Sequence, residues 1–151
     1  MAERFKTPPE IVKRNGLILV VAIVATFAVL RLALQTSPDS DFNVGGYNVH
    51  HLFIGLLFIA AGGIPLAVFR GHTRKLDVAL VIFGVGLGMA LDEWVYLIAT
   101  DGSNASYLLP VSFWGGVLVV SLACAYALGL VAGRAMRVRV APRWCRRRGA
   151  D

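Results

Sequence analysis

The chain has 151 residues, of which 57% are apolar and only 16% are charged. A water-soluble domain of this size carries roughly a quarter charged residues, spread along its length. The composition therefore excludes an ordinary soluble globular enzyme, a disordered chain and a disulfide-rich secreted scaffold. It is the composition of an integral membrane protein.

The chain contains four apolar runs, and each is long enough to cross the hydrocarbon core of a bilayer, about 30 Å thick, as a helix. Backbone polar groups in lipid must be satisfied within the segment, which favours helices over strands. We therefore expect an all-α membrane protein, a single domain over residues 1–151 built as a four-transmembrane-helix bundle. The expected spans are about Gly16–Leu34, His51–Phe69, Leu76–Thr100 and Leu108–Met136, followed by a basic tail over 137–151.

The basic residues alternate along the chain. Apart from Arg31, every Lys and Arg lies before the first span, between the second and third, or from Arg134 onward, and the connections 35–50 and 101–107 contain none. This pattern follows the positive-inside rule and predicts a multi-pass protein of the cell (inner) membrane with both termini in the cytoplasm. Although the net charge is +6, its placement argues against a nucleic-acid partner. The Arg-rich tail is expected to contact anionic membrane lipids.

Glycines predict which face of the third span packs against other helices, because small residues mark close helix approach in lipid. Gly84 and Gly88 form a GxxxG pair, and Asp92 follows four residues later on the same stripe. Gly86 lies seven residues before Glu93, so this acid also lies above a glycine. Both acids are expected to face neighbouring helices, and the glycine faces also predict contacts in a homo-oligomer.

The second span repeats this pattern. His51, Gly55 and Gly62 are spaced by four and seven residues and share one face. His51 is therefore expected to face inward. Asn48 is expected to cap this helix and place His51 in its first turn.

Helix lengths place the ionisable residues at similar depths. Arg31 and Asp92 each lie about 22–24 Å from the cytoplasmic end of their helices, and His50 and His51 begin the second span at the outer boundary. Two acids beside one arginine leave one negative charge that a divalent cation would compensate. The sequence thus predicts a metal site made of His51, His50, Asp92 and Glu93, with Zn, Mn or Fe as the ion.

Some of these residues also have explanations that need no metal site. Arg31 could snorkel to the interface or form a structural ion pair with Asp92 or Glu93. His50 could be an ordinary interfacial residue. Tyr107 and the neighbouring aromatic residues fit an interfacial belt.

Two segments resemble motifs of uncharacterised small integral membrane proteins of bacteria and archaea. They are NVHHLFIG, with His50 and His51, and GVGLGMALDEW, with Asp92 and Glu93. The resemblance covers the second and third spans and implies that these four residues belong to one site.

Three functions follow as hypotheses. The first is a membrane metalloprotein, and more specifically a metalloenzyme that acts on a lipid or a small molecule. In this enzyme, Asp92 and Glu93 would be the catalytic acids, and Arg31 would bind an anionic group such as a lipid phosphate. The second is a transporter or channel for protons, metal ions or small solutes, which would require an oligomer. The third is a non-catalytic membrane assembly protein, in which the polar patch is structural.

Overall fold

The computed structural model describes residues 9–36, 43–44, 47–48, 50–69, 71 and 73–140. Its described elements are five helices and one hairpin of two short strands, each two residues long. In chain order they are α1 Pro9–Thr36, β1 Asn43–Val44, β2 Tyr47–Asn48, α2 His51–Val68, α3 Arg74–Ala99, α4 Asn104–Tyr107 and α5 Pro110–Val140. Most of the predicted basic tail, residues 141–151, lies outside the described residues.

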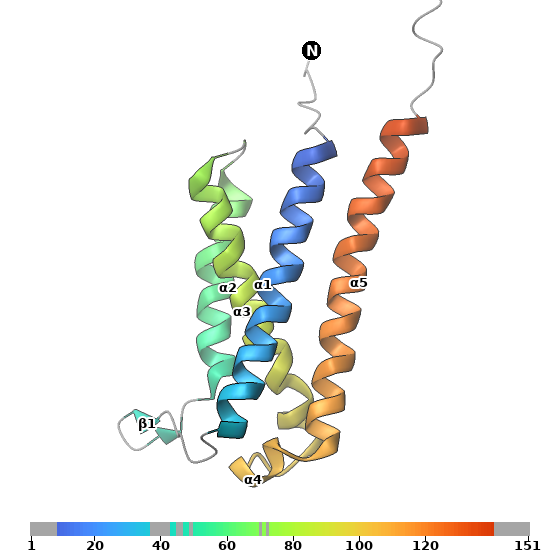
Figure 1. Ribbon diagram of the computed structural model, residues 1–151. Coiled ribbons are helices and arrows are strands. Elements are labelled where there is room, and N and C mark those ends of the chain that lie inside the picture. The colour runs from blue at the N-terminus through green and yellow to red at the C-terminus, as the bar shows by residue number, and fades with distance from the viewer. Residues whose placement is uncertain are drawn as a thin grey trace, which may run out of the picture.

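The all-helical prediction is confirmed, and in the described part of the chain α1, α2, α3 and α5 are long and apolar enough to cross a membrane. α1 begins at Pro9 and α5 extends to Val140, so both are longer than the apolar runs predict. The hairpin and the single turn of α4 were not predicted. Both lie at the end of the bundle opposite the start of α1, as Figure 1 shows.

α3 is the central helix of the bundle, because it packs against α1, α2 and α5. Its buried residues include three glycines and both acids, whereas the described faces of the other helices expose many large apolar side chains. Such outward apolar surface is what a lipid-facing bundle presents. Ile23, Leu91 and Val120 form the small apolar core where α1, α3 and α5 meet.

The predicted glycine faces are contact faces within the chain. A Cβ atom added at Gly86 would lie 2.6 Å from the backbone oxygen of Gly55 and 2.6 Å from the amide nitrogen of Ile59 on α2. A Cβ atom at Gly88 would lie 2.7 Å from the Cβ of Thr26 on α1. The glycines thus allow the backbones to approach closely and fix the direction in which Asp92 and Glu93 point.

On α5, by contrast, a Cβ atom at Gly129 would meet nothing within 4 Å. The predicted homo-oligomer contact through a glycine face stays a prediction.

We predict that Gly86→Ala lowers the free energy of unfolding by about 1–3 kcal/mol, because the added methyl group would push against backbone atoms of α2 that cannot rotate away. Denaturant unfolding in detergent micelles measures this loss. Gly129→Ala is the matched control, and it should leave stability unchanged or raise it by up to about 1 kcal/mol through helix propensity. Equal stability of Gly86→Ala and the wild type would contradict this packing.

Candidate functional site

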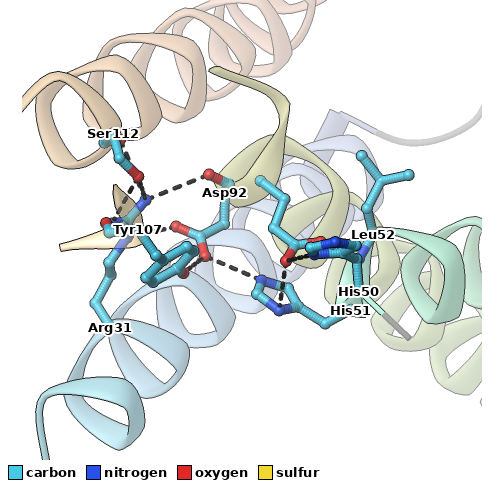
Figure 2. Close-up of polar contacts among 8 residues, drawn as sticks. Arg31, His50, His51, Leu52, Asp92, Tyr107 and Ser112 are labelled. Atoms are coloured by element: carbon cyan, nitrogen blue, oxygen red, sulfur yellow. Dashed lines mark hydrogen bonds and ion pairs between the residues drawn. The ribbon is translucent and has the colours of Figure 1, made fainter. Parts of the chain in front are cut away.

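Five helices contribute to one polar cluster at the end of the bundle that carries α4. Figure 2 shows how its side chains point toward one another. The structure brings together every residue that the sequence singled out, and adds contacts from three others. The predicted residues are Arg31 on α1, His50 and His51 at the start of α2, and Asp92 and Glu93 on α3; the additions are Leu52, Tyr107 and Ser112.

Arg31 and Asp92 form a direct ion pair in the interior of the bundle. The Nε of Arg31 donates to Oδ1 of Asp92 at 2.6 Å, and the side chains are 7% and 0% exposed. The remaining guanidinium nitrogens donate to the carbonyl oxygens of Tyr107, Asp92 and Ser112 and to the Ser112 hydroxyl, at 3.1–3.3 Å. Arg31 therefore does not snorkel to the interface, since each of its nitrogens is engaged inside the protein.

The space for the guanidinium group comes from α5. A Cβ atom at Gly116 would lie 3.2 Å from Nη2 of Arg31, and Ser112, one turn earlier, is fully buried beside it. The spacing of Ser112 and Gly116 in the sequence signals a small-residue face, but not its use as a pocket for arginine. The aromatic ring of Tyr107 covers the other side, 4.2 Å from Cζ of Arg31, which is within the range of a cation–π contact.

Tyr107 belongs to the cluster and not to an interfacial belt. Its side chain is buried, and its hydroxyl donates to Oδ2 of Asp92. Burial raises the pKa of the Tyr107 phenol, and the negative charge of Asp92 raises it further. The phenol therefore stays protonated and acts as a hydrogen-bond donor.

Glu93 caps the start of α2 from the neighbouring helix. Its Oε2 accepts the backbone N–H of Leu52 at 2.6 Å. The expected cap by Asn48 was wrong, because α2 begins at His51 with His50 as its N-cap residue, and the His50 side chain makes no capping hydrogen bond. A carboxylate at this position satisfies an amide that the helix leaves open and interacts favourably with the helix dipole.

The second oxygen of Glu93 faces both histidines. The Nδ1 atoms of His50 and His51 lie 3.3 Å and 3.1 Å from Oε1 of Glu93. Among the described residues, the ion pairs of Glu93 are with these two imidazoles, and no Lys or Arg lies within ion-pair distance of it. The Glu93 side chain is only 3% exposed, whereas those of His50 and His51 are 23% and 19% exposed. The cluster is therefore accessible from its imidazole side.

His51 bridges the two acids. Its Nε2 lies 3.1 Å from Oδ2 of Asp92, and its Nδ1 lies 3.1 Å from Oε1 of Glu93. A neutral imidazole has one donor and one acceptor nitrogen, so it can donate to only one of two carboxylates. In a neutral His51, one of the two contacts therefore places a ring nitrogen without a proton beside a carboxylate oxygen.

The potential metal ligands of the cluster are not arranged as a complete metal site. Within the described ranges of the chain, no three His, Cys, Asp or Glu side chains are grouped as a complete set of metal ligands. The short contacts instead join one ring to one carboxylate at a time. Asp92 in particular has Oδ1 occupied by Arg31 and Oδ2 shared by Tyr107 and His51.

In comparisons with known proteins, no family model, no curated protein and no solved structure matches the chain.

We predict that Arg31→Gln destabilises the protein by about 3–5 kcal/mol, because it leaves the Asp92 carboxylate buried without its charge partner. Denaturant unfolding in micelles gives the value. The double variant Arg31→Gln/Asp92→Asn should recover part of the loss, since the unpaired charge is then gone.

Arg14→Gln is the control for the Arg31 variant. Arg14 pairs with Asp77 at 2.6 Å, but these side chains are 43% and 30% exposed, so the loss should stay below about 1 kcal/mol. Equal losses for the two single variants would contradict the burial of the Arg31–Asp92 pair.

Proposed function

We propose that the protein is a multi-pass membrane protein that binds a divalent cation between His50, His51 and Glu93. One observation carries the proposal: the Nδ1 atoms of two imidazoles lie 3.3 Å and 3.1 Å from the same oxygen of a buried carboxylate. Imidazole nitrogen and carboxylate oxygen together are typical ligands of Zn, Mn and Fe.

The contact distances support an ion of zinc size. Tetrahedral ligands at about 2.0–2.1 Å from zinc are separated from each other by about 3.3–3.4 Å. The two ring-to-carboxylate contacts, at 3.1 Å and 3.3 Å, already have nearly this length. A three-ligand site then requires the two partly exposed rings to turn until both Nδ1 atoms face one ion.

Charge supports the same proposal. Arg31 neutralises Asp92, so a divalent ion on Glu93 leaves the site with one net positive charge. A site of this kind keeps an open position for water, hydroxide or an anionic group. Hydrolysis of a lipid or small-molecule ester stays a prediction, with Glu93 as a ligand and Asp92 held by Arg31. All three nitrogens of the Arg31 guanidinium group already donate hydrogen bonds within the protein. An anionic group would therefore bind to the metal ion and not to Arg31.

Transport is the weaker candidate. Ile23, Leu91 and Val120 fill the place where α1, α3 and α5 meet, between Asp92 and the start of α3. In the described part of the chain, this apolar core would separate the cluster from the other end of the bundle. A purely structural cluster, held by a proton in place of a metal, is the remaining alternative and is an outcome of the following test.

We predict that chelator-treated protein in micelles binds one Zn²⁺ per chain, and that Glu93→Gln lowers the affinity by more than about 100-fold, beyond the typical cost of losing an outer-shell partner. Metal analysis and competition titration measure both values. Binding should weaken as the pH falls, because the ion and a proton compete for the same imidazoles.

Asp77→Asn is the matched control for Glu93→Gln, because Asp77 lies on the same helix about 24 Å from Glu93. It should bind Zn²⁺ like the wild type. If the wild type takes up no more zinc than Glu93→Gln, the metal proposal is refuted and the cluster is a proton-held ion network.

The same proposal includes the topology given by the basic residues: both termini in the cytoplasm of a cell membrane, and the cluster near the outer surface. Alkaline phosphatase fused after Thr36 should be active, and the same enzyme fused after Gly71 should be inactive. A fluorescent protein at the C-terminus should fluoresce. The opposite activities would reverse the orientation and place the cluster on the cytoplasmic side.

A further inference from the structure

Asp92 and Glu93 are adjacent in sequence but meet His51 from opposite sides of its ring. Oδ2 of Asp92 lies 3.1 Å from Nε2 of the ring, and Oε1 of Glu93 lies 3.1 Å from its Nδ1. These positions are chemically distinct, because a neutral imidazole carries its single proton on one nitrogen only. The partner that accepts this proton decides which nitrogen can bind an ion.

The position of Asp92 as a hydrogen-bond acceptor for His51 is fixed by other donors. Its side chain is fully buried, Arg31 donates to Oδ1 at 2.6 Å, and the Tyr107 hydroxyl donates to Oδ2. A second Arg31 nitrogen donates to the backbone carbonyl of Asp92 at 3.3 Å. These donors hold the carboxylate in place, and its Oδ2 lies 3.1 Å from Nε2 of His51, where it can accept a hydrogen bond from the ring.

We propose that Asp92, held by Arg31 and Tyr107, is a positioning residue that keeps the proton of His51 on Nε2 and leaves Nδ1 to bind the cation. The inference rests on the proposed cation site and assigns Asp92 a role outside the ligand set. Carboxylate-to-histidine contacts of this kind orient the ring and raise the basicity of the ligating nitrogen.

Asn at position 92 would reverse this arrangement. Its amide oxygen can still accept from Arg31, so its NH₂ group would face Nε2 of His51 and donate to it. The ring proton would then move to Nδ1, the nitrogen that faces Glu93, and block the ion. Asp92→Asn retains the size of the side chain but also removes the charge partner of the buried Arg31, so the folding of this variant is checked before its proton position is read.

The test is ¹⁵N NMR of histidine-labelled protein in micelles, read with and without ¹¹³Cd²⁺ as the probe ion. In the wild type, Nε2 of His51 should carry a proton in both states, and cadmium should show scalar coupling to Nδ1. In Asp92→Asn, the proton should move to Nδ1 in the metal-free state, and the cadmium affinity should fall about 10- to 100-fold. Arg14→Gln should leave the proton position and the affinity unchanged.

The outcomes separate this inference from the proposed function. An unprotonated Nε2 in the wild type, or cadmium coupling to Nε2, would overturn the positioning role even if the metal binds. A protonated Nε2 with no cadmium bound would support the Asp92–His51 contact and refute the cation site. If Asp92→Asn fails to fold, the wild-type spectra alone still decide which nitrogen holds the proton.

Discussion

Charge buried inside a bundle of apolar helices must be compensated inside the bundle, and the arrangement of this protein follows from that constraint. The Arg31–Asp92 pair is the central case, with both side chains almost completely buried. Because the pair joins α1 to α3 and Arg31 also donates to residues of α4 and α5, it ties the helices together at the end of the bundle that carries α4. A guanidinium group suits this place, since its five N–H donors form a rigid planar set that several acceptors can share.

The two adjacent acids have different surroundings because consecutive residues of a helix point about 100° apart. Asp92 faces the arginine of α1, and Glu93 faces the start of α2. One acid is thus compensated by a permanent charge, and the other by a helix terminus and two imidazoles that can exchange protons or bind an ion. The permanent pair can hold the bundle together, whereas Glu93 is the acid at which we propose that the cation binds.

The sequence predicted the four long helices and the inward direction of both acids, because hydropathy indicates the length of a helix and the GxxxG stripe indicates the face on which helices approach closely. It also predicted that Arg31 and Asp92 lie equally far along their helices with His51 slightly above, and the structure brings these three residues into contact. The cap of α2 was mispredicted, because Glu93 supplies it from a helix about forty residues further along the chain. Tyr107 was missed as a donor to Asp92 because its position near a span end fits an aromatic belt equally well. Such contacts depend on how helices cross, which no short sequence pattern reports.

The central claim is that two imidazoles and one carboxylate at the mouth of this cluster hold a divalent ion. X-ray absorption spectroscopy of the zinc-loaded protein tests it most directly, because imidazole rings give a characteristic multiple-scattering pattern. The expected spectrum shows two imidazole nitrogens and carboxylate oxygen at about 2.0–2.2 Å from the metal. A shell of oxygen ligands without imidazole scattering would contradict the claim and leave the cluster as a structural ion network.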